Sequence, residues 1–348
     1  MRKELLDYLA CADCGSAFEL KTDDPDDAII SGEVLCPKCG TSYPIIRGIL
    51  RYLDGIKTDA DLRRVYADSF GHQWTTYQWL RDEDEAEFYA ITELGPENFR
   101  NVKVLDAGCG GGRVARFVAR DAEVFIGADL SIAVEKAAQL CADIPHAHFV
   151  QCDVRRMPLR RAFFDVVYSH GVLHHTPNTK ASFDNLPSLV KPGGILYVAL
   201  FRATFPPLRL SDGLIRSVVS RLPISAVDRF CDALAHLHRM PNASNVKRFF
   251  WFSLQATHEI RKCCLYDWYA PRFHHEHTVT EVMQWFRDAG FPDVRYINAW
   301  PYCPANEKHA IPGWRQSFRL GQLLGCIGTR SRTGHEADVE HGAHLLKL

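Results

Sequence analysis

The sequence has no long hydrophobic run and no excess of charge of either sign. No stretch of its 348 residues approaches the run of about 18–20 apolar residues that crosses a bilayer, so we expect no membrane span. Its 41 Lys and Arg nearly balance 42 Asp and Glu, which gives a net charge of −1. This balance excludes a global basic footprint for nucleic acid, although a local patch is compatible with it, and we expect no DNA partner.

The N-terminus also lacks the apolar core of a signal peptide. Acidic side chains interrupt the short apolar stretch between Met1 and Leu9. We therefore expect a cytoplasmic protein. A hydrophobic fraction of 47% and a charged fraction of 24% are those of an ordinary globular chain, and the length suits more than one domain.

Four of the 12 cysteines form two Cys-x-x-Cys pairs, and the other eight are scattered. The scattered thiols are expected to be reduced core residues. The paired ones are Cys11, Cys14, Cys36 and Cys39. Because the pairs stand about twenty residues apart and each is followed by glycine, they predict a structural zinc ion held by four thiolates, with no position open for catalysis.

This zinc site would organise an N-terminal module, residues 1–53. A module of this size has too little core to fold alone, so the metal would supply its stability. Short β-type segments around the second pair predict a ribbon of strands. Disulfides or a redox centre are the alternative that the spacing leaves open.

Strands alternate with helices from residue 101 onward. The expected strands are residues 102–107, 124–128, 148–152, 164–169, 194–201, 294–299 and 323–329. This alternation predicts an α/β fold with a Rossmann-like, doubly wound, mostly parallel sheet of seven strands, built from residues 101–201 and 278–332. Three other segments lie outside it: residues 54–100 as a helical linker, 202–277 as a helical insertion and 333–348 as a flexible tail.

A glycine-rich turn follows the first strand of this core. Asp106 precedes glycines at 108, 110, 111 and 112, and a helix begins just after them. Such a turn brings a ligand to backbone amides at the carboxyl edge of the sheet. The fingerprint of a dinucleotide-binding site requires a third glycine at position 113, where this sequence has arginine, and this difference argues against such a site. Asp106 would repel a pyrophosphate and would suit a ligand that carries an ammonium group.

Two more acids follow the next two strands. Asp129 ends the second strand and is placed to accept the hydroxyls of a ribose. Asp153 ends the third strand and is placed to accept from the exocyclic amine of an adenine. With Asp106 they predict a site for a cationic nucleoside. The alternative is that these acids only cap helices or turns.

Several segments resemble, in residue type and in order, the motifs of class I S-adenosylmethionine-dependent methyltransferases. They are residues 106–112, Asp129, Asp153, 164–175 and 189–196. The similarity is greatest to the branch that includes ubiquinone and menaquinone biosynthesis methyltransferases (methyltransferase type 11). It covers about residues 100–200 and continues more weakly over 278–330. The resemblance implies S-adenosylmethionine as the cofactor, bound by Asp106, Gly108, Gly110, Gly112, Asp129, Leu130, Asp153, Val154 and His170.

Three histidines follow the fourth strand, beside the expected position of the cofactor's methyl group: His170, His174 and His175. One of them is a candidate general base for a hydroxyl acceptor, because histidine titrates near neutral pH. Alternatively, one lines the cofactor pocket and another holds the loop through a backbone hydrogen bond. Enzymes that methylate the exocyclic amines of DNA or RNA bases typically carry Asn or Asp, two prolines and an aromatic residue after the fourth strand. This sequence does not carry that motif.

Acceptor specificity is expected from segments outside the core. The insertion, residues 202–277, is basic and carries the aromatic run 249–252, which suits an anionic or amphipathic acceptor but equally an amphipathic lid with a solvated basic face. The run from His274 to His277 is compatible with a metal site, but we expect these side chains to form part of a polar surface. The segment from Phe70 to Trp74 either closes over the cofactor or packs in the core.

The N-terminal module resembles the zinc-ribbon activator subunit of tRNA and release-factor methyltransferases, here fused to the catalytic domain. The resemblance rests on residues 5–11 and 43–50. That family usually has proline in place of Ala12 and in place of Leu50. The resemblance implies a ribbon that adds to the catalytic sheet.

These observations predict a methyltransferase that acts on a small-molecule, glycan or lipid-like acceptor, with oxygen as the expected atom. An RNA or protein methyltransferase that docks its substrate through the ribbon is the alternative. A non-catalytic cofactor-binding scaffold and a nicotinamide-dependent oxidoreductase are further alternatives. The neutral net charge favours the small-molecule acceptor, and the intact acids and glycines disfavour the scaffold.

Overall fold

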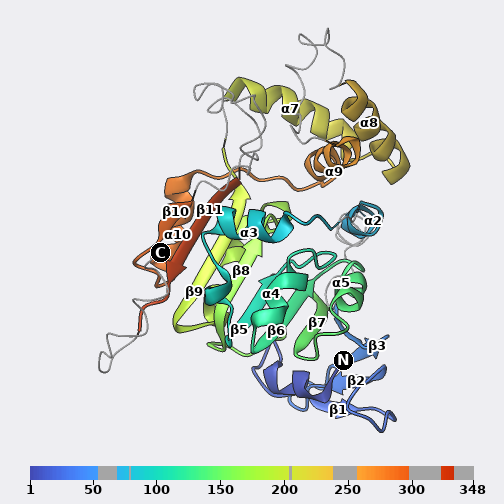
Figure 1. The fold of residues 1–348 in the computed structure, drawn as a ribbon, viewed down its shortest axis with the longest axis vertical. Coiled ribbons are helices and arrows are strands. Elements are labelled where there is room, and N and C mark those ends of the chain that lie inside the picture. The colour runs from blue at the N-terminus through green and yellow to red at the C-terminus, as the bar shows by residue number, and fades with distance from the viewer. Residues whose placement is uncertain (54–68, 78–79, 204–205, 238–256, 298–322, 333–348) are drawn as a thin grey trace.

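A computed structural model describes residues 1–53, 69–77, 80–203, 206–237, 257–297 and 323–332. The predicted tail, the aromatic run 249–252 and part of the predicted linker lie outside the described residues. Figure 1 shows the N-terminal ribbon at one end of the molecule, the α/β core in the middle and the helical insertion at the other end. The described helices include none that is long and apolar enough to span a membrane.

The core sheet contains the seven strands that the sequence predicts. Their order is β7-β6-β5-β8-β9-β11-β10, and only β11 and β10 run antiparallel to their neighbours. Their bounds are β5 (Lys103–Ala107), β6 (Val124–Asp129), β7 (Ala147–Cys152), β8 (Phe164–His170), β9 (Val190–Phe201), β10 (Arg295–Ile297) and β11 (Leu323–Thr329). The order reverses beside β5, so a ligand crevice is expected at the carboxyl ends of β5, β6 and β8.

Within the described residues the sheet has eleven strands rather than seven, because the ribbon extends it. The four ribbon strands are β1 (Glu19–Lys21), β2 (Ser31–Leu35), β3 (Ser42–Ile46) and β4 (Ile49–Tyr52). They pair antiparallel with one another, and β4 then pairs in parallel with β7, with Leu50 opposite Val150 and Tyr52 opposite Cys152. The ribbon therefore adds to the catalytic sheet, as its resemblance implied.

One hydrophobic core continues from the ribbon into the α/β domain. Leu5, in the 3₁₀ helix η1 (Lys3–Tyr8), and Leu50 are fully buried in the same cluster as Val150 and Leu105. The ribbon therefore shares its core with the domain beside it, which offsets its small size.

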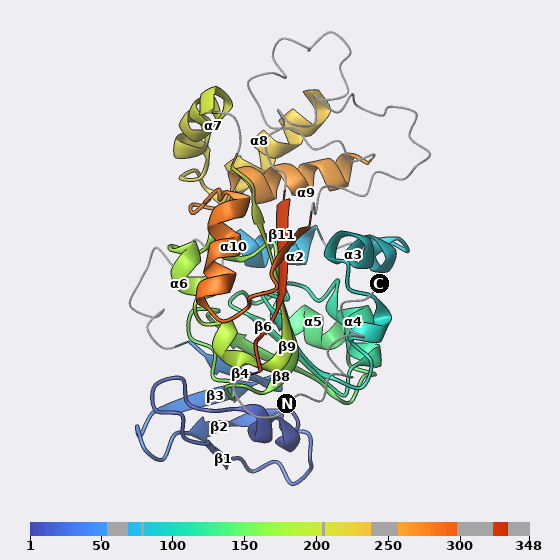
Figure 2. The same cartoon turned by 90° about the vertical axis from the view of Figure 1, so that its left-hand side faces the viewer.

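Helices cover both faces of the sheet, as Figure 2 shows. Alternate residues of a strand face opposite sides, so Phe125 belongs to the core that includes residues of α3, α4 and α5, while Ile126 belongs to the core of the other face. Phe183 and Phe286 bring α6 and α10 onto that second face. These helices are α3 (Asp84–Thr92), α4 (Ala115–Asp121), α5 (Val134–Leu140), α6 (Thr179–Phe183) and α10 (Val279–Asp288).

The insertion forms its own small core beyond the carboxyl ends of the strands. It consists of α7 (Pro206–Val219), α8 (Ile224–Leu237) and α9 (His258–Tyr269). Cys231, Tyr266 and Trp268 are its buried centre, and Phe201 at the end of β9 joins them. The short helix α2 (Ser69–Thr76) lies between this insertion and the sheet edge (Figure 1).

Candidate functional site

The glycine turn after β5 requires residues without side chains. Gly108, Gly110 and Gly112 have φ of +103°, +51° and +83°, a region that L side chains rarely adopt. A Cβ on Gly108 would lie 2.3 Å from the Val172 side chain, and one on Gly112 would lie 2.7 Å from Cα of Ala137. The turn is therefore closely packed against Val172 and Ala137, and glycine is required at these positions.

Asp129 holds this turn against the end of β6. Its Oδ2 accepts a hydrogen bond from the Gly110 amide at 2.8 Å, and its Oδ1 accepts from the amide and hydroxyl of Ser131 at 2.8 and 2.7 Å. Burial raises the pKa of Asp129, and these hydrogen bonds oppose that shift. The carboxylate thus shapes the turn, and Oδ2 keeps a lone pair for a further donor.

Asp106 is buried at the end of β5 and has one hydrogen-bond donor from a neighbouring strand. The Tyr168 hydroxyl on β8 donates to its Oδ2 at 2.9 Å. Burial raises the pKa of Asp106 to about 8; the Tyr168 hydrogen bond opposes the shift and the charge of Asp129 adds to it. A cation in the crevice would favour the charged form of both acids, so this donor set fits a ligand with an ammonium group.

Asp153 lies at the end of β7, where its carboxylate is bonded to Arg155. Oδ1 accepts from the Arg155 amide at 2.8 Å, and Nε of Arg155 lies 3.0 Å from each oxygen. The sequence alone did not predict this pair. Contact of Asp153 with an adenine amine stays a prediction, as does contact of the neighbouring Val154 with the adenine.

The residue after β6 is tied to β7. The backbone oxygen of Leu130 accepts from the side-chain amide of Gln151 at 2.9 Å. Leu130 is half-buried beside Asp129, at the sheet edge where the sequence predicts the nucleoside. The ends of two strands are therefore fixed relative to each other at the candidate site.

Helix α2 covers the glycine turn. A Cβ on Gly110 would lie 3.3 Å from the Trp74 indole, and one on Gly71 would lie 3.3 Å from the Ile132 side chain. On its other side α2 contacts α9, because Gln73 donates to Asp267 at 3.1 Å. Of the two roles proposed for the segment from Phe70 to Trp74, this position suits a cover over the site.

His170 faces the site from the end of β8. Its ring stacks on Tyr197 with an interplanar angle of 12°, and Nδ1 lies 3.4 Å from the tyrosine hydroxyl. Burial, followed by the charge of Arg113, lowers the pKa of His170 to about 4. The ring is therefore neutral at physiological pH, which suits a residue that lines a pocket for a cation.

His174 and His175 lie in the 3₁₀ helix η4 (Leu173–His175), and the structure gives them different partners. Nδ1 of His174 accepts from the Phe201 amide at 3.2 Å, and burial lowers the pKa of this histidine well below 6.5. Nδ1 of His175 lies 3.1 Å from the Phe273 carbonyl, and its Nε2 lies 3.8 Å from a carboxylate oxygen of Asp267. His174 thus holds the loop, while the ring of His175 is buried and has a carboxylate neighbour.

The run from His274 to His277 packs against η4. The side chains of His274 and Glu276 are each 7% exposed, and the His275 amide donates to the His174 carbonyl at 2.9 Å. The expectation of a polar surface is therefore wrong for His274 and Glu276. The run supports the loop that carries the candidate base.

The four ribbon cysteines converge on one point. Their Sγ atoms all lie within 4.8 Å of one another, with Cys11 and Cys39 at 3.9 Å and Cys14 and Cys36 at 3.5 Å. Four sulfurs about 2.3 Å from a tetrahedral zinc would stand about 3.8 Å apart. The cysteines among the described residues are all free thiols, so the geometry fits zinc rather than a pair of disulfides.

The two Cys-x-x-Cys turns have the same backbone hydrogen bonds. In each, the amide of the glycine that follows donates to the first cysteine's carbonyl at 2.8 Å. Gly15 and Gly40 have φ of +71° and +70°, so both turns need glycine. The repeated turn explains why glycine follows both pairs.

A cavity of about 730 Å³ lies between the first of these turns and the core. On the side of the α/β domain, the cavity is lined by the segment after β7, which carries Arg155, Arg156, Arg160 and Arg161. Arg156 pairs with Asp13 across the cavity and lies 5.6 Å from the Tyr52 ring centre. Arg160 and Arg161 are exposed, and neither forms an ion pair with a described residue.

Comparison with known families agrees with both parts of this architecture. Residues 105–198 match the family described as a methyltransferase domain, and residues 2–48 match the family described as Trm112p-like protein. The chain therefore carries a methyltransferase domain of Rossmann-like fold and a Trm112p-like zinc ribbon.

Curated relatives are similar over the catalytic domain. A malonyl-[acyl-carrier protein] O-methyltransferase of Enterobacter lignolyticus is 29% identical over 42% of this chain and 58% of its own. An uncharacterized methyltransferase of Mycobacterium bovis is 35% identical over 28% of this chain and 50% of its own. The chain thus spans only about half the length of these relatives.

A solved complex of the Haloferax volcanii Trm112 methyltransferase activator with a methyltransferase also matches this chain. It is 14% identical, covers 75% of this chain and 97% of that one, and has a TM-score of 0.44.

Proposed function

We propose that this chain transfers a methyl group from S-adenosylmethionine to oxygen of a small-molecule, glycan or lipid-like acceptor. The observation that carries the proposal is the glycine turn of a methyltransferase domain, which lies beside the buried Asp106 and the half-buried Asp129. Among the described residues, no lysine or arginine donates a hydrogen bond to either acid, so the crevice favours a cationic ligand over a phosphate.

The chain's residues would hold this cofactor at the carboxyl edge of the sheet. Gly108, Gly110 and Asp106 would lie against the methionine portion, Asp129 against the ribose, and Asp153 with Val154 against the adenine. When bound, the cofactor supplies a methyl group that its sulfonium already activates. The protein's remaining tasks are to align the acceptor, exclude water and remove a proton.

Proton removal is assigned to His175. Its Nδ1–H is directed to the Phe273 carbonyl, which leaves Nε2 as the basic nitrogen. Asp267 lies 3.8 Å from this nitrogen, so its carboxylate would stabilise the imidazolium that forms. His170 is assigned to the cofactor pocket and His174 to holding the loop.

The acceptor is assigned to the space under α2 and the insertion. Asp267 is 32% exposed there and joins both His175 and Gln73 of α2. Helix α7 presents Leu210, Leu214 and Val218, which are 70%, 65% and 62% exposed at helical spacing. These apolar side chains support an amphipathic acceptor, and the relative named as an O-methyltransferase supports oxygen.

The proposal is tested by incubating the full chain with metabolite extract and S-adenosylmethionine that carries a labelled methyl group. We expect the label in a small or lipid-like product, with a labelled ether or ester identified by mass spectrometry. The Asp129→Ala variant serves as the control and, at a cofactor concentration that is limiting for the wild type, should label the extract much less. Binding of NADH in preference to S-adenosylmethionine would refute this assignment of the glycine turn.

RNA or protein is the second candidate acceptor. It is supported by the Trm112p-like module and by the arginine-lined cavity beside it. Binding to RNA through arginines would show a steep salt dependence. If bulk RNA binds at sub-micromolar affinity with such a dependence and becomes methylated, the small-molecule proposal fails.

A further inference from the structure

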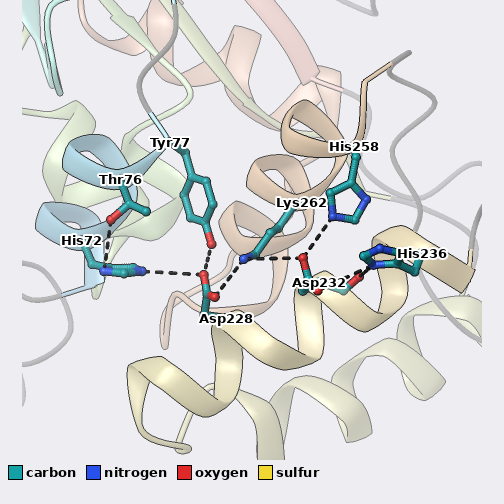
Figure 3. Close-up of polar contacts among 8 residues, drawn as sticks. All are labelled: His72, Thr76, Tyr77, Asp228, Asp232, His236, His258 and Lys262. Carbon is teal, nitrogen blue, oxygen red and sulfur yellow. Dashed lines mark hydrogen bonds and ion pairs between the residues drawn. The ribbon is translucent and has the colours of Figure 1, made fainter.

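A polar cluster outside the candidate active site joins three helices. Figure 3 shows Asp228, Asp232 and His236 on α8 facing His258 and Lys262 on α9, with His72 of α2 and Tyr77, directly after α2, reaching toward Asp228. The cluster lies apart from the ribbon cysteines, at the opposite end of the molecule (Figure 1). Neither the methyl-transfer proposal nor the zinc ribbon uses it.

Three of these side chains have the spacing of metal ligands. The donor atoms of Asp232, His236 and His258 all lie within 4.8 Å of one another. Nε2 of His258 lies 3.0 Å from Oδ1 of Asp232, and Nδ1 of His236 lies 3.6 Å from Oδ2. Ligands about 2.0–2.1 Å from a tetrahedral ion stand about 3.3 Å apart, which these two distances bracket.

The arrangement of the ligands on the helices favours a single ion. Asp232 and His236 are four residues apart, so they share one face of α8. His258 begins α9 and approaches that face from the neighbouring helix. Nδ1 of His236 now lies 2.9 Å from the Asp232 carbonyl, a local contact that the 64% exposed side chain would exchange for the metal.

The surrounding charges permit a cation. The ammonium of Lys262 lies 3.6 Å from Asp232 but 2.8 Å from Asp228, so Asp228 is its nearer partner. Tyr77 also donates to Asp228, and His72 lies 3.7 Å from it. With neutral histidines the two acids and one lysine carry a net charge of −1, and Asp232 retains its charge for a metal.

We infer that Asp232, His236 and His258 form a second metal site, selective for Zn²⁺ and similar divalent transition ions. Two imidazoles and one carboxylate are ligands that suit such ions, and water would complete the coordination. The ion would join α8 to α9. Because α8 also carries Asp228, the same ion would fix the residue that Tyr77, directly after α2, contacts.

The site is tested with Co²⁺ as the probe, added to full-length protein whose ribbon is already filled with zinc. We expect one Co²⁺ per chain, with visible absorption typical of nitrogen and oxygen ligands and no thiolate charge-transfer band. His258→Gln and Asp232→Asn should each weaken Co²⁺ binding by more than about a hundredfold, because even outer partners of a metal are worth about 10–100-fold. Circular dichroism establishes that each variant is folded.

Two matched variants separate a metal site from a hydrogen-bonded cluster. His72→Gln removes a histidine of the same cluster that is not a ligand and should leave Co²⁺ binding unchanged. Lys262→Met removes the competing ammonium and should tighten it. Absence of Co²⁺ binding to the zinc-filled protein, or equal binding by the wild type and the folded His258→Gln and Asp232→Asn variants, would overturn the inference.

Discussion

The Tyr168 hydroxyl on β8 donates a hydrogen bond of 2.9 Å to Oδ2 of Asp106 on β5, and both side chains are buried. Asp106 and Tyr168 are direct partners in the parallel register of the two strands, so the pairing of β5 with β8 sets this contact. The hydrogen bond lowers the pKa of Asp106, but burial outweighs it and brings the pKa to about 8. Without a cationic ligand, Asp106 is therefore mostly protonated at neutral pH.

This protonation predicts a pH-dependent stability that Asp106→Asn removes. The folded protein keeps a proton on Asp106 up to about pH 8, whereas the unfolded chain loses it near its ordinary value of 3.8. The free energy of unfolding should therefore fall as pH rises between these values, by at most about 1.4 kcal/mol per pH unit from this group. Urea unfolding of both proteins at pH 6 and pH 8, without ligand, measures the difference. An identical pH dependence would contradict the prediction.

Asp129→Ala should weaken binding of S-adenosylmethionine by about 1.5–3 kcal/mol, the scale of a lost charge-assisted hydrogen bond. Part of this loss reflects the Gly110 amide, which loses its acceptor. Isothermal titration calorimetry gives the value directly. The control is Asp143→Ala, whose carboxylate is 67% exposed and pairs with Arg116 away from the crevice; equal losses in the two variants would exclude a specific role for Asp129.

Gly110→Ala should destabilise the protein and impair cofactor binding. An alanine there must adopt a φ near +51° and would approach the Trp74 indole to 3.3 Å. The backbone conformation alone costs about 1–2 kcal/mol. Gly213→Ala is the matched control, because that glycine lies in α7 with nothing within 4 Å, and there alanine should stabilise by up to about 1 kcal/mol. Thermal unfolding distinguishes the two, and a neutral Gly110→Ala would refute the constraint on the turn.

Cys14→Ser should release the ribbon's zinc and melt the ribbon, because such sites contribute about 10–16 kcal/mol of apparent binding energy. Elemental analysis after mild chelation measures the tightly held ion. Cys264→Ser changes a thiol on α9, outside the ribbon, and should keep the metal. A metal-free ribbon that stays folded would disprove the structural role of zinc.

Once an acceptor is known, two asparagine variants test the assignment of the base. His175→Asn keeps a donor for the Phe273 carbonyl but lacks Nε2, so turnover should fall about 10²–10⁴-fold and the acidic limb of the pH–rate profile should disappear. His174→Asn keeps an acceptor for the Phe201 amide and should retain the profile. Loss of the acidic limb in His174→Asn instead would move the base to that residue.

The glycine turn and the ribbon were predictable because their chemistry is local. A turn that needs positive φ requires glycines, and a zinc site requires cysteines at a short, repeated spacing. Both patterns can be recognised within a few consecutive residues of the sequence. The alternation of strands and helices likewise indicated the α/β core and its seven strands.

Contacts between distant segments were not predictable in this way. Asp267 meets His175 from a helix that begins more than eighty residues later in the chain, and no periodicity marks it as a partner. The approach of Trp74 to Gly110 depends on how α2 packs on α9, so the sequence left two roles open for that segment.

One local contact was also not predicted. Arg155 follows Asp153 by only two residues and bonds to its carboxylate, but a charged side chain near a strand end usually faces solvent.

The parallel pairing of β4 with β7 also changes how this assembly responds to dilution. A separate activator chain dissociates from its partner when both are dilute, whereas a ribbon on the same polypeptide faces β7 at an effective concentration that can reach the millimolar range. Docking of the ribbon is thereby a first-order folding step, with a midpoint that does not depend on how much protein is present. Edge strand β7 is covered in every molecule whose ribbon is folded, which also removes an open template for intermolecular strand pairing.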